Sequence, residues 1–293
     1  MEKVHLNPSD LKQKLCFDLH TFLESEPHNF LSLQTFFTSL LSKYFSSNRS
    51  NFHEFLLSLS SEDRTLLFIR HGESQYNHWR KKSCCNLPIF YLNKPNNYDP
   101  RLTDKGHEQA GKAVDTLISF NNKERINIDT VYVSPLTRAL ETYMHFDKSL
   151  KKANEDLQVL AMDLIRERMD YACDIGSKKE ILVEEFGKNV DFKYVSREIW
   201  WRSNEMDNYQ ELSKEKIIDE SKNMVYLRVL MFITLVLLED RGRNVLIVSH
   251  QNVHKCLFRN YAVFGTKIRN CEIQKLNKKQ LNEFLEQAVN LLN

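Results

Sequence analysis

The feature that most constrains this 293-residue chain is a short apolar run that ends in a compact polar motif. Residues 66–69 are all apolar, and Arg70-His71-Gly72-Glu73-Ser74 follows directly. A short run that is apolar on both alternating faces predicts a strand buried from both sides, as in a parallel sheet covered by helices. Ligands of such sheets bind beyond the carboxyl ends of the strands, so Arg70 and His71 are expected beside a binding crevice. A guanidinium next to an imidazole suits an anion.

Three later segments repeat the arrangement of an apolar strand followed by a residue suited to phosphate chemistry. Residues 129–133, 157–165 and 244–249 are strand-like, and they are followed by Arg138, Glu167 and His250. Because the carboxyl ends of parallel strands meet at one edge, we expect these side chains to converge with Arg70 and His71. Each alone has an ordinary alternative: a surface arginine, one acid in a polar run, or a histidine at a strand end. Their repetition at successive strand ends indicates a site.

The chain after the second strand suggests a helix start that favours anions. Ser134 suits the N-cap position, and Pro135 suits the first position of the helix. Arg138 then falls near the first turn, where free backbone N–H groups and the helix dipole already favour negative charge.

Two of these stretches resemble the signature motifs of the histidine phosphatase superfamily, which has the phosphoglycerate mutase-like fold. Arg70-His71-Gly72 is similar to the first motif, and Ser134-Pro135-Leu136-Thr137-Arg138-Ala139-Leu140-Glu141-Thr142 is similar to the second. The resemblance covers about residues 64–260. It implies that His71 is the nucleophile and that Glu167 is the general acid. It also implies that Arg70, Arg138 and His250 bind the phosphoryl group.

Two positions depart from the family pattern. Ile165 stands where the family has Leu in the segment that carries the acid, and Gln251 stands where Gly usually follows the late histidine. The second departure leaves the backbone geometry after His250 open. Asn77 matches a polar neighbour of the phosphate in the family. Asn77 and Gln251 therefore complete the candidate substrate-binding residues.

The expected fold is an α/β three-layer α/β/α sandwich with a mostly parallel sheet, preceded by a helical extension. Residues 1–62 carry apolar residues at helical spacing and no chemically suggestive cluster, and residues 63–293 form the predicted catalytic domain. The extension is interpreted as an accessory helical layer, and the alternative is a surface for dimerisation or partner binding. Residues 75–101 predict a long polar loop, and residues 170–210 predict an irregular region.

Composition narrows the class of protein. The net charge of +2 gives no overall attraction to nucleic acid or membranes, so any anion site must be local. The six cysteines show no zinc-site spacing, and reduced thiols are expected. The chain starts without an apolar leader, and its most apolar stretch, residues 229–238, is about half the ~20 residues that span a bilayer. We expect a cytoplasmic protein with a small phosphorylated substrate and no nucleic-acid or membrane partner; a homodimer is possible.

The function predicted from the sequence is a metal-independent phosphatase that hydrolyses phosphate monoesters through a phosphohistidine on His71. No cofactor is expected, and the sequence offers no carboxylate cluster to hold a metal. A cofactor-dependent phosphoglycerate mutase is the first alternative, with Arg80, Lys81 and Arg101 available for a substrate carboxylate. A catalytically silent phospholigand-binding protein is the second, and the complete candidate set argues against it. The long link after the first motif and Glu198-Ile199-Trp200-Trp201 resemble the phosphatase-type branch.

Overall fold

A six-stranded sheet with the order β4-β3-β2-β5-β1-β6 lies at the centre of the protein. The computed structural model describes residues 7–25, 30–60, 64–82, 98–198, 200–201, 220–239, 243–258 and 267–292. The strands are β1 (Thr65–Arg70), β2 (Thr130–Val133), β3 (Gln158–Met162), β4 (Asp191–Tyr194), β5 (Asn244–Ser249) and β6 (Ile273–Leu276). All neighbouring strands pair in parallel except β6, which is antiparallel to β1. The sheet is therefore mostly parallel, as the sequence predicts.

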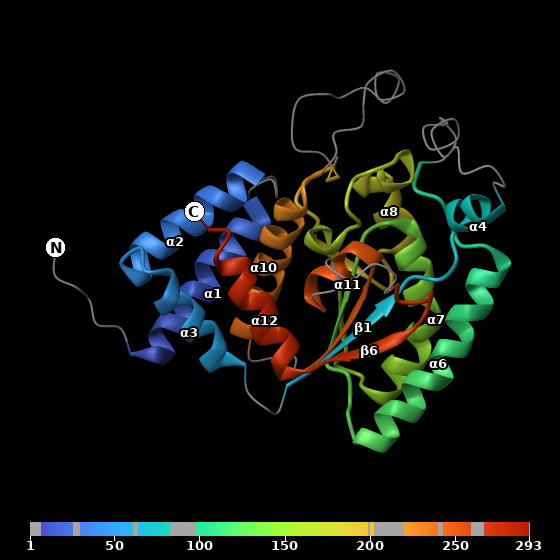
Figure 1. Cartoon of the computed structure of the whole chain (residues 1–293). Helices are drawn as coiled ribbons and strands as arrows, with labels where there is room; N and C mark the ends of the chain where they lie inside the picture. Colours follow the sequence, from blue (N-terminus) through green and yellow to red (C-terminus); the bar gives the residue numbers. More distant parts are fainter. Residues whose placement is uncertain are drawn as a thin grey trace.

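Helices cover both faces of this sheet (Figure 1). They include α1 (Pro8–Ser25), α2 (Phe30–Phe45), α3 (Arg49–Leu59), α4 (Gln75–Lys82), α6 (Asp104–Glu124), α7 (Thr137–Ala153), α8 (Lys179–Phe186), α10 (Lys222–Leu238), α11 (Gln251–Leu257) and α12 (Lys278–Val289), with the 3-10 turns η2 (Asp163–Ile165) and η3 (Ala172–Asp174). Along β1, Leu66 and Phe68 pack with α10 and α12, whereas Leu67 and Ile69 pack with α6 and α7. This division confirms the three-layer sandwich, and it explains why β1 is apolar at every central position.

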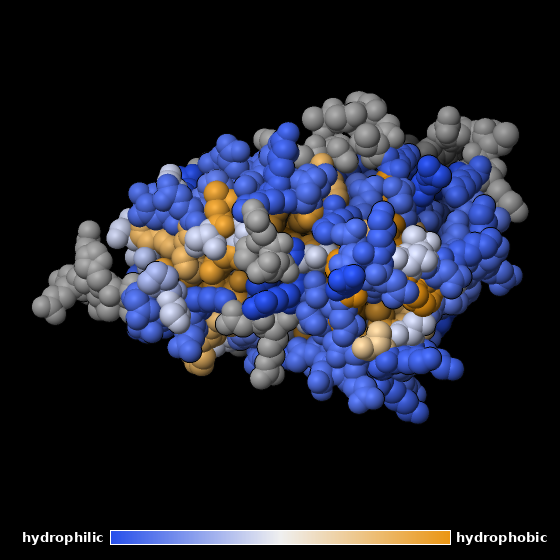
Figure 2. Space-filling view, turned by 90° about the horizontal axis from the view of Figure 1, so that it is seen from below, coloured by the Kyte–Doolittle hydropathy of each residue, from blue (hydrophilic) through white to orange (hydrophobic). Residues whose placement is uncertain are grey.

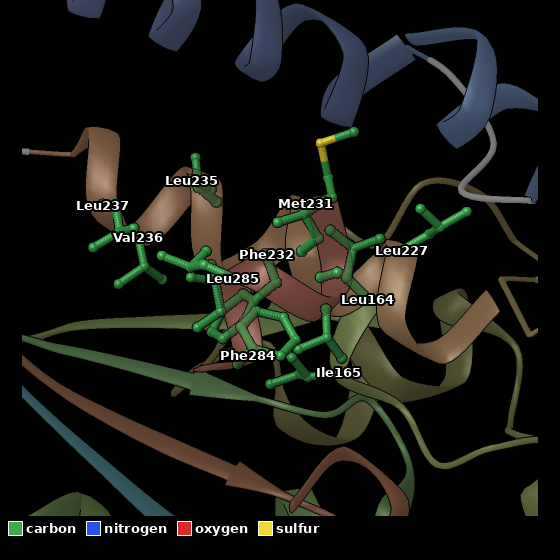
Figure 3. Close-up of a cluster of buried hydrophobic side chains, with 14 of the residues drawn as sticks. Leu164, Ile165, Leu227, Met231, Phe232, Leu235, Val236, Leu237, Phe284 and Leu285 are labelled. Atoms are coloured by element: carbon green, nitrogen blue, oxygen red, sulfur yellow. The ribbon is translucent and has the colours of Figure 1, made fainter. Parts of the chain in front are cut away.

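Helix α10 is buried on all sides because it lies between the sheet and the N-terminal helices. Every residue from Met224 to Leu238 is buried. Figure 3 shows side chains of α10 packed with Phe284 and Leu285 of α12. The same hydrophobic cluster continues into α1, α2 and α3. The helical extension is thus confirmed, and it shares one core with the sheet. A division of the chain into residues 1–62 and 63–293 stays a prediction.

The face of the molecule seen from below is mostly hydrophilic (Figure 2). Seen from below, hydrophobic residues gather in two areas, one of them at the end of the molecule where α1, α2 and α3 lie (Figure 2). Phe17 of α1 belongs to the exposed large hydrophobic residues, with 71% of its surface accessible. Within the described ranges, no helix combines the length and the apolar character needed to cross a membrane.

The predicted loop after β1 is wrong for residues 75–82, which form α4. Ser74 and Asn77 cap this helix reciprocally: the Asn77 N–H donates to Ser74 Oγ (3.2 Å), and the Ser74 N–H donates to Asn77 Oδ1 (3.4 Å). Such a pair satisfies donors that a helix start leaves free, so a short polar segment can become helical without an apolar face. Residues 83–97 of the predicted loop lie outside the described residues.

Two further local predictions are wrong. Helix α7 starts at Thr137 with Leu136 as N-cap, so Ser134 does not cap it, although Arg138 still lies in the first turn. The Ser134 hydroxyl instead contacts the ring of His250. Part of residues 170–210 is regular, since α8 and the edge strand β4 lie there. Strand β4 has only four residues, of which two are buried, so its pattern is too short to be recognised.

Candidate active site

The strand order brings the predicted residues to one edge of the sheet. Strands β3, β2, β5 and β1 are neighbours in that order. The candidate residues that follow them are, respectively, Glu167, Arg138, His250 and His71. Arg70 pairs in register with Ser249, and the His71 N–H donates to the Ser249 carbonyl (3.0 Å). The rings of His71 and His250 consequently lie with their centroids 5.0 Å apart.

One ring nitrogen of His71 carries a lone pair that can attack a substrate. Its Nδ1 lies 2.7 Å from the Gly72 carbonyl oxygen. A carbonyl only accepts hydrogen bonds, so the ring proton is on Nδ1 and the lone pair is on Nε2. Burial lowers the pKa of His71 well below its ordinary value, and the charges of Arg138 and Arg70 lower it further. The imidazole is therefore neutral at about pH 7, which leaves Nε2 nucleophilic.

Two guanidinium groups lie at the same edge, each oriented by fixed partners. Nη1 of Arg70 donates to the Ile268 carbonyl (2.8 Å), and its buried Nε has no hydrogen-bond partner among the described residues. Arg138 is buried, with Nη1 donating to the Cys173 carbonyl (2.6 Å) and Nη2 to Asp174 Oδ1 (3.0 Å). Burial lowers the pKa of Arg70. Burial acts on Arg138 in the same direction, but the combined effect of Asp174, Cys173, Asp99 and Glu167 outweighs it, so the pKa of Arg138 is raised.

The carboxylate of Glu167 joins this group from the loop after β3. Its Oε1 accepts the N–H of Arg168 (2.8 Å) and the N–H of Asn252 (3.2 Å). Asn252 lies in the first turn of α11, so the second bond ties the acid to the β5–α11 junction. The charge of Glu167 opposes the effect of burial on the pKa of both Arg70 and Arg138. Glu167 is half-buried, and it lies close enough to both guanidinium groups for its charge to act on them.

His250 and its neighbour carry polar atoms that the described protein does not satisfy. His250 Nε2 lies 2.7 Å from Ser134 Oγ, which also accepts the Leu136 N–H (3.4 Å). When the hydroxyl donates to Nε2, the proton of a neutral His250 ring is on Nδ1. Nδ1 of His250 and both amide atoms of Gln251 are buried without a hydrogen-bond partner in the described part of the chain. A bound ligand would satisfy such atoms.

Sequence reasoning missed the segment that leads into β6. Asn270 Nδ2 donates to the His71 carbonyl (2.8 Å) and to Asn77 Oδ1 (3.5 Å). The Cys271 N–H donates to the Arg70 carbonyl (2.8 Å). Because β6 is antiparallel, it begins at the edge where the parallel strands end. No motif marks this segment in the sequence, and Asn77 reaches the site through it.

Close backbone packing fixes the turn that carries His71. A Cβ atom at Gly72 would lie 2.6 Å from the Gly106 carbonyl oxygen, and one at Gly106 would lie 2.3 Å from the Glu73 carbonyl oxygen. Only glycine allows α6 to approach the turn this closely. The Gly72 N–H also donates to Thr142 Oγ1 of α7 (3.0 Å). Helices α6 and α7 thus hold the turn from one side.

The described residues contain no group of three or more His, Cys, Asp or Glu side chains placed to hold a metal ion. Cys16, Cys173, Cys256 and Cys271 are free thiols. Cys84 and Cys85 lie outside the described residues.

The sheet and its edge define an α/β protein that gathers two histidines, two arginines and a carboxylate at the ends of parallel strands. The family model of the histidine phosphatase superfamily (branch 1) matches residues 66–281. The chain belongs to the histidine phosphatase superfamily.

Individual relatives share about half of their length with this chain. A probable phosphatase of Schizosaccharomyces pombe is 27% identical over 128 residues, which are 42% of this chain and 50% of the relative. A 2,3-bisphosphoglycerate-dependent phosphoglycerate mutase of Bartonella quintana is 31% identical over 140 residues, 48% of this chain and 56% of the relative. The crystal structure of an ecdysone phosphate phosphatase from the silkworm is similar over 72% of this chain and 88% of its own, with 17% identity and a TM-score of 0.41.

Proposed function

We propose that the protein is a metal-independent phosphatase that hydrolyses phosphate monoesters through a phosphohistidine on His71. The observation that carries the proposal is a neutral imidazole whose Nε2 lone pair is free, beside the guanidinium groups of Arg70 and Arg138. A phosphate monoester is a dianion, so a neutral nucleophile among cations is suited to approach it. Membership of the histidine phosphatase superfamily supports the proposal.

In the first half-reaction the nucleophilic Nε2 attacks phosphorus, and the bond between phosphorus and the ester oxygen breaks. Arg70, Arg138 and His250 donate hydrogen bonds to the phosphoryl oxygens while charge redistributes. Removal of one such donor typically lowers kcat about 10²–10³-fold. Glu167 protonates the leaving alkoxide. The Gly72 carbonyl, which accepts the Nδ1–H, stabilises the positive charge that develops on the ring.

In the second half-reaction the ionised Glu167 removes a proton from a water molecule that attacks the phosphohistidine. The bond between phosphorus and Nε2 breaks, and its electron pair returns to the ring nitrogen. Inorganic phosphate leaves, and Glu167 is protonated again for the next cycle. The same carboxylate therefore serves as acid and then as base.

The phosphoglycerate mutase alternative needs cations for the substrate carboxylate, and the candidates Arg101 and Lys81 already pair with carboxylates of the protein. Arg101 forms a two-pronged ion pair with Glu185 (2.7 and 2.6 Å) and contacts Glu141 (2.8 Å). Lys81 is paired with the buried Glu73 (2.6 Å). Cations already neutralised by carboxylates bind a further carboxylate weakly, which favours hydrolysis.

A silent phospholigand-binding protein is the second alternative. Binding alone requires the cations but neither a free Nε2 on His71 nor a carboxylate among the cations. A carboxylate such as Glu167 repels a phosphate dianion unless it serves in proton transfer. The presence of both features favours an enzyme.

The deciding experiment is phosphate transfer to the protein. Wild-type protein incubated with radioactive p-nitrophenyl phosphate, without added metal, is expected to carry an acid-labile label and to release phosphate. His71→Ala should abolish both while retaining the wild-type circular dichroism spectrum. His53→Ala, a histidine of α3, is the matched control and should behave as wild type.

A second experiment distinguishes a phosphatase from a phosphoglycerate mutase. Conversion of 3-phosphoglycerate to 2-phosphoglycerate is compared with release of inorganic phosphate from the same mixture, primed with bisphosphoglycerate. The proposal expects phosphate release to be faster. Fast isomerisation with little free phosphate would identify a mutase instead.

A further inference from the structure

A buried ion cluster on α10 has no part in the mechanism described above. Arg228 is the one charged side chain of α10 apart from Lys222 at its start, and it is 0% exposed. Its partner Glu220 precedes the helix and is 7% exposed. Buried charges are costly unless paired, so a position surrounded by apolar side chains needs a reason to carry one.

The donors of Arg228 reach the backbone of the loop that carries Glu167. Nη1 donates to the Leu164 carbonyl (2.5 Å), and Nη2 donates to the carbonyl of Glu167 itself (3.3 Å). Figure 3 shows Leu164 and Ile165 packed among the side chains of α10, so this turn is held by apolar contacts as well. Arg228 therefore holds the loop at Leu164, which precedes the acid, and at Glu167 itself.

Glu220 holds the other side of the same loop. Its carboxylate accepts the Met169 N–H (3.1 Å), and its own N–H donates to the Met169 carbonyl (3.0 Å). The carboxylate also accepts from Arg228 Nε (2.9 Å) and from Arg166 Nη2 (3.1 Å). Burial raises the pKa of Glu220, but Arg166 and Arg228 outweigh burial and hold the pKa below its ordinary value. The ionised cluster thus bonds the loop on both sides of Glu167.

We propose that Arg228 and Glu220 are positioning residues that orient Glu167 for proton transfer to the leaving group, an inference that rests on the proposed phosphatase function. A buried ion cluster can often be replaced by apolar side chains without loss of stability, so stability alone does not account for this one. What apolar side chains cannot supply is a set of directional bonds to Leu164, Glu167 and Met169. Those bonds determine where the Glu167 carboxylate lies.

The test compares esters with good and poor leaving groups. Arg228→Met removes the donors and keeps an apolar chain of similar length; Arg228→Lys and Glu220→Gln are milder variants that serve if Arg228→Met does not fold. Thr234→Val is the matched control, because Thr234 is buried on the same helix and its hydroxyl has no hydrogen-bond partner among the described residues. Its kinetics should equal those of wild type.

Arg228→Met should lower kcat for glycerol phosphate about 10²-fold and change kcat for p-nitrophenyl phosphate little, because only the alkoxide needs protonation. In Glu167→Gln the same substitution should cause no further loss, since it acts through that carboxylate. An equal loss for both esters, or additive losses, would overturn the inference while the phosphatase function stood.

Amide hydrogen exchange tests whether the ion cluster holds the loop around Glu167, independently of catalytic activity. Arg228→Met should accelerate exchange at Arg168 and Met169 at least about tenfold, with β3 amides unchanged. Unchanged exchange at these two amides would overturn the inference. A wild-type protein that hydrolyses no ester would refute the proposed function instead, and the exchange data would still decide whether the cluster holds the loop.

Discussion

At the scale of single residues, surroundings decide what the two site histidines can do. Burial lowers the pKa of both His71 and His250 well below the ordinary value, and Arg138 lowers both further. Each ring also has one nitrogen held by the protein: Nδ1 of His71 by the Gly72 carbonyl, and Nε2 of His250 by Ser134. The first ring is left with a lone pair and the second with a donor. In the proposed mechanism these identical side chains therefore take opposite roles, nucleophile for His71 and hydrogen-bond donor for His250.

The neutral state of His71 predicts a loss of stability in acid. Between the lowered pKa of the folded protein and the unfolded value of about 6.5, the unfolded chain binds the proton more readily. The stabilising effect of neutral His71 is therefore complete above about pH 6.5 and is lost as the pH falls through the folded pKa. The Tm of His71→Asn should fall less than that of wild type between about pH 7.5 and about pH 5. Thermal unfolding followed by circular dichroism measures both changes; equal falls would contradict a buried neutral imidazole.

At the scale of elements, the sequence predicts the parallel strands β1, β2, β3 and β5, because each of these carries its own signal, whereas the parallel edge strand β4 does not. Strand β1 is apolar on both faces and ends at Arg70, and β5 ends in the same way before His250. Contacts that join distant segments have no such signal. Asn270 reaches His71 because β6 is antiparallel, and Arg228 reaches Glu167 because α10 packs against the turn that precedes Glu167. Neither periodicity nor a local motif reports a contact of this kind, so these residues could not be predicted.

His20 of α1 connects this helix to Tyr194 of β4 and to Glu239, which follows α10. Its Nε2 lies 3.3 Å from Glu239 Oε1, and its Nδ1 lies 2.8 Å from the Tyr194 hydroxyl. Hydrogen bonds with Cys16 and Glu239 raise the pKa of His20 to about 9. Stability from the charged ring is therefore fully present below about pH 6.5 and is lost as the pH rises through about 9.

The expected outcome is that His20→Gln lowers the free energy of unfolding more at about pH 6 than at about pH 10. Urea unfolding of the variant and wild type at both pH values measures this difference. The same loss at both pH values would show that the charge on His20 does not hold α1 in place.

At the scale of the whole molecule, the residues that stabilise the N-terminal helices and the residues of the candidate site lie in different parts of the protein. One hydrophobic cluster runs from the sheet through α10 into α1, α2 and α3, so the N-terminal helices contribute to the stability of the whole chain. The candidate site depends instead on where β1, β2, β3 and β5 end. A defect in the outer helical layer should consequently weaken the fold before it alters catalysis.

Two phenylalanines of the N-terminal helices test this separation. Phe37 is 0% exposed and packs against Phe36 and Phe52, whereas Phe17 is 71% exposed. Phe37→Ala leaves a cavity in the shared core and should lower the free energy of unfolding by about 3–5 kcal/mol. Phe17→Ala should change the free energy of unfolding by less than about 0.5 kcal/mol.

Urea unfolding gives both free energies, and kcat is measured under conditions in which both variants are fully folded. Both should retain the wild-type kcat, because the strand ends that carry His71 and Glu167 are unchanged; a reduced kcat in folded Phe37→Ala would mean that the extension also shapes the active site.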